Sequence, residues 1–226
     1  DLAALTVTGG TLGERLARPP ADPVDRAVVA ARATPLEPEG GLVALFGSLA
    51  PGGAILKRSA ADKRLLEHTG RAVVFTSLED LAARIDSPDL DVTADDVLVL
   101  QNAGPRSASA MPEAGYLPIP KKLARAGVKD MLRISDARMS GTAYGAVVLH
   151  VTPDAASGGP LALVRDGDRI SLGVAAKRLD LLVEPAELER RRAALPQPAP
   201  VTRRGYDRLY YEHVLLADEG CDFDFC

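Results

Sequence analysis

"RISDARMSGTAYGAVVLHVTP", residues 133–153, indicates two β-strands separated by a turn of small residues. A plain hairpin would favour Asn-Gly or Asp-Gly between its strands, whereas Ser140 stands here between Met139 and Gly141. Gly141 and Gly145 allow the backbone to approach another group closely. On the pattern alone Ser140 is either a turn residue or a reactive hydroxyl, and the turn is the simpler interpretation.

Apolar runs of strand length recur along the chain. They cover residues 42–47, 54–59, 72–76, 96–101, 130–135, 146–151, 161–164, 169–172 and 179–183. Helical patterns are fewer and occur at residues 77–85, 118–127 and 184–195. Because several strands are joined by tight turns, the pattern favours an α/β fold with a barrel-like or curled sheet and helices packed outside. It disfavours a regular doubly wound parallel sheet.

Composition points to an ordinary globular protein. The chain has 226 residues, 46% hydrophobic and 26% charged, and one domain is the default for that length. Trp is absent and Phe and Tyr number four and five, so the core has to be aliphatic. The formal net charge of −4 argues against nucleic acid as a partner.

The chain carries no apolar run of about 18 residues and no signal-peptide pattern, so we expect a soluble, cytoplasmic protein without a membrane partner. Cys221 and Cys226 have neither the spacing of a metal knuckle nor that of a disulfide framework, and they are expected to be free thiols. Residues 200–226 hold three of the five tyrosines and end in acidic residues, which is typical of a docking tail.

Three other features have residue types that can carry chemistry. Pro112 stiffens the chain before Glu113, so the carboxylate has a defined direction that suits a hard cation, although a solvated residue at a helix start fits the spacing too. Lys57 and Arg58 follow a glycine pair and are either ligands of an acid group or surface cations. His150 alternates within an apolar strand, which favours a hydrogen-bonded structural role.

The same stretches resemble the C-terminal part of the dihydroxy-acid and sugar-acid dehydratase family of iron–sulfur enzymes. The resemblance rests on "GSLAPGGAILKRSA", "NAGP", "MPEAGYLPIPKKLARAGVKDMLRISDARMSGTAYGAVVLHVTP", "GGPLALVRDGDRI" and "RLDLLVEPAELERRR". These runs cover most of residues 42–193 in order. "DARMSGTAYG" and "EHVLLADEGCDFDF" are most similar to the branch that acts on L-arabinonate and other pentonates.

The resemblance implies a swivelling β/β/α domain and gives roles to particular residues. Glu113 of the Met-Pro-Glu motif would be a Mg²⁺ ligand and Ser140 the proton acceptor, with Gly141 and Thr142 contacting the substrate. The implied cofactors are Mg²⁺ and a [2Fe–2S] cluster. The implied reaction is that of a hydro-lyase: a 2,3-dihydroxy acid such as an aldonic acid loses water and becomes a 2-keto-3-deoxy acid.

The resemblance also implies that the site is incomplete. The cluster cysteines belong to an N-terminal domain absent from this chain, so residues 1–226 would be one C-terminal domain, inactive alone, of an enzyme expected to be a homo-oligomer. The alternatives are a separately encoded small subunit of an aconitase-like hydro-lyase and a non-catalytic binding domain of the same fold.

One departure from the family concerns the loop before Glu113. "SASA", Ser107 to Ala110, stands where the family has a glycine-rich segment. If that segment requires positive φ, a chain without glycine would displace Glu113.

Overall fold

The computed structural model of the chain describes residues 1–18, 24–113, 117–141, 143–196 and 204–226. It divides into two compact units, residues 1–40 and residues 41–226. The single domain over residues 1–226 stays a prediction. No helix among the described residues has the length and apolar character needed to cross a membrane.

The first unit contains one short helix, α1 (Leu12–Leu16). Thr11 caps it: the Thr11 hydroxyl accepts from the Glu14 N–H at 3.2 Å, and the Glu14 carboxylate accepts from the Thr11 N–H at 2.8 Å. This capping box satisfies two N–H groups that the helix itself leaves unpaired. None of the described residues in this unit is buried.

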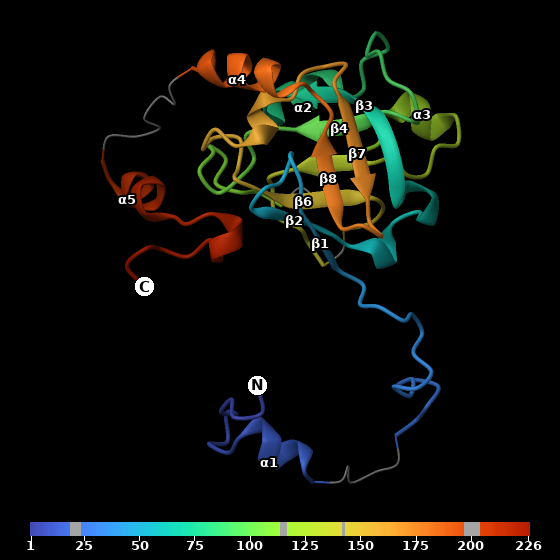
Figure 1. The fold of residues 1–226 in the computed structure, drawn as a ribbon, viewed down its shortest axis with the longest axis vertical. Coiled ribbons are helices and arrows are strands. Elements are labelled where there is room, and N and C mark those ends of the chain that lie inside the picture. Colours follow the sequence, from blue (N-terminus) through green and yellow to red (C-terminus); the bar gives the residue numbers. More distant parts are fainter. Residues whose placement is uncertain (19–23, 114–116, 142, 197–203) are drawn as a thin grey trace. The chain divides into compact units, whose positions relative to one another are not determined.

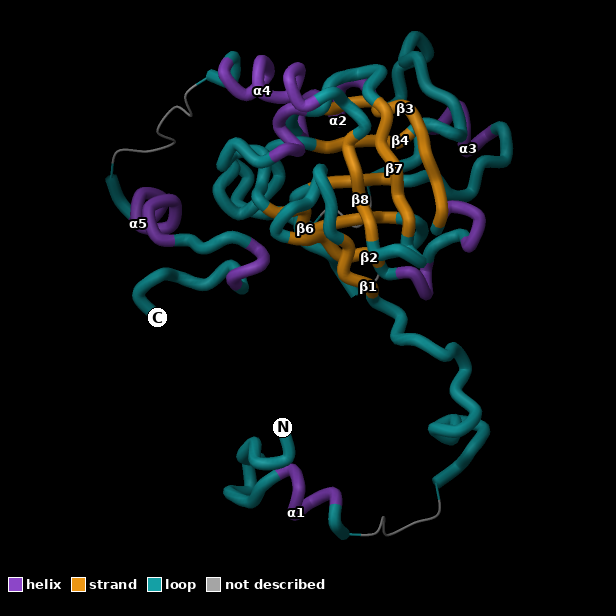
Figure 2. Tube along the Cα trace, in the orientation of Figure 1, coloured by secondary structure: helices purple, strands orange, loops and turns teal. Residues whose placement is uncertain are grey.

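Residues 41–226 form a sheet of eight strands, which Figures 1 and 2 show crossing one another in two layers. The strands are β1 (Val43–Leu45), β2 (Gly53–Leu56), β3 (Glu67–Phe75), β4 (Val97–Leu100), β5 (Arg133–Ser135), β6 (Val147–Thr152), β7 (Arg169–Gly173) and β8 (Arg178–Leu181). Their order in the sheet is β1-β2-β6-β5-β4-β3-β7-β8.

Strand direction divides the sheet. β3, β4, β5 and β6 are parallel neighbours, whereas β1, β2, β7 and β8 pair antiparallel. Arg133 of β5 pairs with Val147 of β6 in the parallel sense, so residues 136–146 are not the turn of a hairpin. They form a crossover that returns the chain to the opposite edge of the sheet before β6 begins.

The two outer strands, β1 and β8, meet and nearly close the sheet into a barrel. Phe46 lies directly after β1 and forms a parallel bridge with Arg178 of β8. The Phe46 N–H donates to the Lys177 carbonyl at 2.9 Å, and the Leu179 N–H donates to the Phe46 carbonyl at 3.0 Å. These bonds satisfy strand edges that would otherwise be open, and the expected barrel-like sheet is confirmed.

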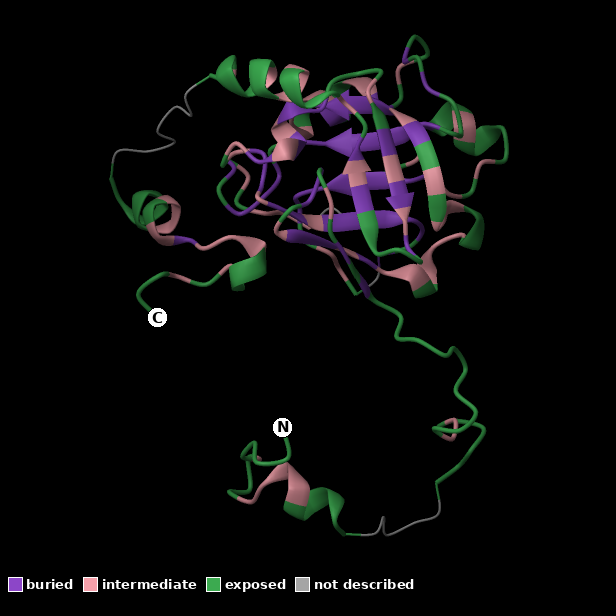
Figure 3. Ribbon diagram, viewed as in Figure 1, coloured by how far each residue is buried: buried purple, intermediate pink, exposed green. Residues whose placement is uncertain are grey.

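β4 and most of β6 are buried on both faces, whereas β7 and β8 alternate between buried and more exposed residues, as the purple and the mixed ribbons of Figure 3 show. In β4, Val97 and Val99 belong to one apolar cluster and Leu98 and Leu100 to a second. The second cluster includes Leu81 of α2 (Leu78–Arg84), so the helix covers the outer face of the sheet. The core is aliphatic, as the composition predicts; its largest fully buried side chain is Phe75.

The remaining helices are short and lie at the ends of strands and loops. They are α3 (Lys121–Arg125), α4 (Pro185–Ala193), α5 (Tyr206–His213) and the 3₁₀ turns Arg58–Ala60, Lys63–Leu65, Pro160–Leu163 and Ala217–Glu219. Residues 161–164 were expected to form a strand, and that expectation is wrong. Leu161 and Leu163 are instead buried in a 3₁₀ turn that begins at Pro160. The apolar run did not distinguish the two structures, because a run this short fits either a strand or a buried helical turn.

Gly47 tests the barrel closure. A Cβ at Gly47 would lie 2.0 Å from the Leu179 carbonyl oxygen, which belongs to the closing strand. We expect Gly47→Ala to lower the free energy of unfolding by about 2 kcal/mol or more, because backbone rather than a flexible side chain has to move. Urea unfolding followed by circular dichroism measures the change.

Gly40→Ala is the matched control. A Cβ at Gly40 would meet nothing within 4 Å, and we expect a change of less than about 1 kcal/mol. Equal stability of the two variants would show that the contact between Gly47 and β8 does not hold the barrel closed.

Candidate functional site

The carboxyl ends of β3, β4, β5 and β6 lie at one edge of the sheet, because these strands are parallel. Two loops leave this edge, residues 101–113 after β4 and residues 136–146 after β5. Open α/β sheets bind ligands at such an edge. The two loops contain the residues to which the family resemblance gives roles.

A buried carboxylate holds the starts of these loops together. Asp136 is 0% exposed, and its two oxygens accept from the Ala103 N–H at 2.9 Å and the Ala155 N–H at 2.8 Å. Burial raises the pKa of the Asp136 carboxyl to about 6, against the opposing effect of these two donors. Asp136 therefore connects the segments that follow β4, β5 and β6.

The loop after β4 packs tightly on a second buried carboxylate. Asp154 accepts from the Arg106 N–H at 2.9 Å, and a Cβ added at Gly104 would lie 2.4 Å from the Asp154 Cβ. The Ser107 hydroxyl donates to the Gly104 carbonyl at 2.7 Å. Only glycine fits at position 104, so this close approach sets the path of the loop.

The next residues adopt a backbone conformation that favours glycine. Ala110 has a φ of 51° and Met111 a φ of 55°, both in the left-handed region. The Met111 N–H donates back to the Gly104 carbonyl at 3.0 Å, which closes the loop on itself. The glycine-free "SASA" segment thus reaches positive φ at Ala110, at a cost of about 1 kcal/mol for an alanine.

The loop after β4 then runs beside the loop after β5. Glu113 forms a parallel bridge with Arg138, and the Arg138 N–H donates to the Pro112 carbonyl at 3.4 Å. Ser140 follows Arg138 by two positions in the chain. The structure therefore brings the segment of Glu113 and the segment of Ser140 side by side, although they lie far apart in the sequence.

Two further side chains hold the Ser140 segment. The His150 Nε2 accepts from the Met139 N–H at 2.9 Å, which confirms the hydrogen-bonded role expected for this histidine. The Lys57 ammonium donates to the Gly141 carbonyl at 2.7 Å. Lys57 directly follows β2, whose last residue Leu56 pairs with the start of β6. Thr142, expected to contact the substrate, lies outside the described residues.

The end of the crossover is fixed by a buried ion pair. Arg133 and Asp130 lie 2.9 Å apart, and each side chain is 6% exposed. The Arg133 guanidinium also donates to the carbonyls of Leu117 and Tyr144, each at 2.9 Å, while Asp130 accepts from the Ala146 N–H. Sequence reasoning gave no role to these residues, although two charges at the start of an apolar strand are a signal of paired burial.

The C-terminal residues contact the loop that carries Glu113. The Tyr211 hydroxyl donates to the Ser107 carbonyl at 2.9 Å, and Arg106 donates to the Val214 carbonyl at 3.2 Å. The Cys221 thiol lies 3.4 Å from the Met111 sulfur. Burial raises the pKa of the Cys221 thiol. That residues 200–226 act as a docking tail stays a prediction.

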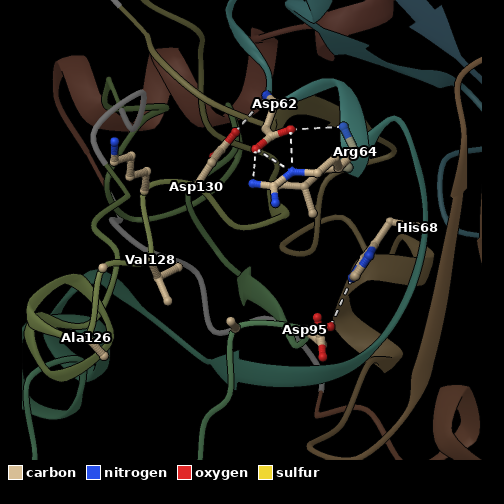
Figure 4. A pocket seen from close by; sticks show the side chains of 11 residues that line it. Asp62, Arg64, His68, Asp95, Ala126, Val128 and Asp130 are labelled. Atoms are coloured by element: carbon tan, nitrogen blue, oxygen red, sulfur yellow. Dashed lines mark hydrogen bonds and ion pairs between the residues drawn. The ribbon is translucent and has the colours of Figure 1, made fainter.

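A separate cavity of about 690 Å³ lies near the amino ends of β3, β4 and β5. Figure 4 shows Asp62 paired with Arg64 and the His68 ring directed at the Asp95 carbonyl. Asp62 and Arg64 form an ion pair in this cavity, and its lining contains none of the residues expected to be functional. The residues to which the resemblance gives roles lie in the two loops after β4 and β5.

Ala110 allows a test of the loop geometry. We expect Ala110→Gly to raise the free energy of unfolding by about 0.5–1 kcal/mol, because glycine takes φ of 51° without steric cost. Ala108→Gly, in the same loop but outside the left-handed region, is the control and should destabilise. Urea midpoints measure both, and a loss of stability with Ala110→Gly would contradict the loop conformation.

Comparison with known proteins shows the family to which the chain belongs. Residues 27–221 match the dihydroxy-acid/6-phosphogluconate dehydratase C-terminal family. The chain is 51% identical to an L-arabonate dehydratase of Azospirillum brasilense over 98% of the chain and 39% of that protein. It is 56% identical to a 6-deoxy-6-sulfo-D-gluconate dehydratase of Pseudomonas putida over 84% of the chain and 33% of that protein.

A more distant relative is a dihydroxy-acid dehydratase of Methanothrix thermoacetophila, 43% identical over 97% of the chain and 40% of its own length. The chain thus spans between 33% and 40% of the length of these relatives. It belongs to the dihydroxy-acid/6-phosphogluconate dehydratase family and corresponds to the C-terminal domain of those enzymes.

Proposed function

We propose that this chain supplies the proton-accepting side of a dehydratase active site that removes water from a 2,3-dihydroxy sugar acid. The observation that carries the proposal is the bridge between Glu113 and Arg138, which aligns the Met-Pro-Glu segment with the segment leading to Ser140. Elimination of water from such an acid needs a site that holds the substrate carboxylate and a group that accepts the C2 proton. The Glu113 carboxylate, as a metal ligand, and the Ser140 hydroxyl suit these two needs and lie on adjacent loops.

The names of the relatives support a sugar acid as the substrate. An L-arabonate dehydratase and an L-arabinonate dehydratase of Rhizobium leguminosarum match 98% of this chain at 51% and 46% identity. Dihydroxy-acid dehydratases match at 38% to 46% identity. We therefore favour a pentonate or a related aldonic acid over a branched dihydroxy acid.

Ser140 takes the central role in the proposal. Its oxygen, as the alkoxide, accepts the proton from C2 of the substrate, and the electron pair of that C–H bond forms the C2–C3 double bond. The C3–O bond breaks, and the departing hydroxide and the proton taken from C2 together make the released water. The enol that remains tautomerises to the 2-keto-3-deoxy acid.

A serine hydroxyl accepts a proton only where its surroundings favour the alkoxide. The Lys57 ammonium, bound to the carbonyl of Gly141, brings a positive charge to the residue that follows Ser140. A nearby cation favours the deprotonated form of a hydroxyl. We assign Lys57 this electrostatic role, and we assign substrate contact to Gly141 and Thr142.

Glu113 fits one position of a Mg²⁺ site, because a carboxylate oxygen is the ligand type that this cation prefers. Among the described residues, no group of three His, Cys, Asp or Glu side chains can hold a metal ion, so the other ligands have to come from outside them. Mg²⁺, when bound, would hold the substrate carboxylate and 2-hydroxyl and make the C2 proton more acidic.

The chain does not fit a [2Fe–2S] cluster. Such clusters are held by cysteine thiolates, in some cases with histidines, whereas this chain has two cysteines and no group of three His, Cys, Asp or Glu side chains among the described residues that could hold a metal. We propose that the cluster and its ligands belong to an N-terminal domain, and that this chain has no dehydratase activity without it.

Ser140→Ala tests the proton acceptor. In the intact enzyme that contains this chain, we expect kcat to fall by about 10² to 10⁴, with a much smaller change in KM, because the oxygen acts in the transition state. Ser171→Ala in β7, which also loses one hydroxyl, is the control and should keep normal turnover. Near-normal kcat for Ser140→Ala would make Ser140 a turn residue.

Glu113→Gln tests the metal ligand. Removing one anionic oxygen ligand should raise the Mg²⁺ concentration that gives half-maximal activity by about tenfold or more, with little change in thermal stability. Titration of activity against Mg²⁺ measures it, with Glu189→Gln on α4 as the control. An unchanged half-saturation point would show that Glu113 does not bind the metal.

A further inference from the structure

His150 interrupts the regular pairing of β6. Gly53 of β2 lies opposite Thr152 and Ile55 lies opposite Leu149, so β6 has one more residue than β2 between these pairs. His150 lies in this bulge and has a φ of 56°, in the left-handed region. Bulges are found beside active sites, where they redirect a side chain.

The bulge allows His150 to hold the segment before Ser140 at two points. Its N–H donates to the Ala137 carbonyl at 2.9 Å, and its Nε2 accepts from the Met139 N–H at 2.9 Å. Arg138, which pairs with the Glu113 segment, lies between these two points. The residue directly after the second point is Ser140.

The second bond defines the state of the imidazole. Nε2 accepts a hydrogen bond only when the ring is neutral and its proton is on Nδ1. Burial, and next the positive charge of Arg138, lower the pKa of His150, so the ring is neutral at pH 7. A glycine at this position would take the same backbone conformation but would leave the Met139 N–H without this acceptor.

We propose that His150 is a positioning residue for Ser140: the Nε2 lone pair fixes the Met139 amide and thereby the direction in which the Ser140 hydroxyl leaves the loop. The role in turnover rests on the proposed function, in which Ser140 accepts the C2 proton. The hydrogen bond itself does not rest on it, so the two are tested separately.

The hydrogen bond is tested by ¹⁵N NMR of the histidine rings in the unmodified 226-residue chain at pH 7. We expect His150 to carry its proton on Nδ1. His68 gives an internal control, because its Nε2 lies 2.9 Å from the Asp95 carbonyl, which only accepts, and its proton is therefore on Nε2. A His150 ring protonated on Nε2 would overturn the proposal without any variant having to fold.

The positioning role is tested by two substitutions in the intact enzyme. His150→Phe keeps a ring but removes the acceptor, and we expect kcat to fall about tenfold or more while KM changes less than about twofold. His150→Gln returns an acceptor oxygen at similar reach and should restore kcat to within about threefold of the unmodified enzyme. His68→Phe is the matched control and should leave kcat unchanged.

Two results would overturn the positioning role. One is an unchanged kcat for His150→Phe in an enzyme that Ser140→Ala inactivates. The other is equal loss in His150→Phe and His150→Gln, which is the result of a purely structural role. Normal turnover of Ser140→Ala would instead overturn the proposed function, with the NMR result for His150 standing on its own.

Discussion

The parallel pairing of β5 with β6 is the constraint on which the candidate site depends. Two adjacent parallel strands cannot be joined by a tight turn, because the chain must first return from one edge of the sheet to the other. Here residues 136–146 make that return, and those of them that the structure describes form no helix. Buried Asp136 holds the start of the crossover, and the buried pair of Arg133 and Asp130 holds its end.

These buried charges fix position more than they add stability. Replacing both members of a buried ion pair by well-packed apolar residues of similar volume often costs little, whereas removing one leaves an uncompensated charge and costs several kcal/mol. The Arg133 guanidinium donates hydrogen bonds to the carbonyls of Leu117 and Tyr144, which belong to neighbouring segments. We infer that such contacts, together with the near-closed barrel, hold the loops of Glu113 and Ser140 in one relative arrangement.

The sequence predicts the strands well and their directions poorly. Apolar runs such as residues 72–76 and 96–101 mark strands buried on both faces, and the structure has β3 and β4 there. Nothing in the period of an apolar run shows whether its neighbour is parallel, so the crossover at Ser140 was not evident. The run at residues 161–164 matched a strand in length and composition but forms a 3₁₀ turn.

The site itself was open to prediction only through the family resemblance. From pattern alone, Ser140 was a turn residue and Glu113 a solvated one. Nothing in the residues of "SASA" predicts the positive φ of Ala110. The one indication is that the family has a glycine-rich segment at these positions. The contact of His150 with Met139 depends on a bulge, which an alternating strand pattern does not show.

A crystal structure of the intact enzyme with Mg²⁺ and an aldonic acid that lacks the 3-hydroxyl would test the central claim most directly. Such a ligand binds at the site but has no group to eliminate. The account predicts Glu113 on the metal and the Ser140 oxygen within about 3.5 Å of C2 of the bound acid. A ligand bound with Ser140 turned away from C2, and another side chain in its place, would contradict it.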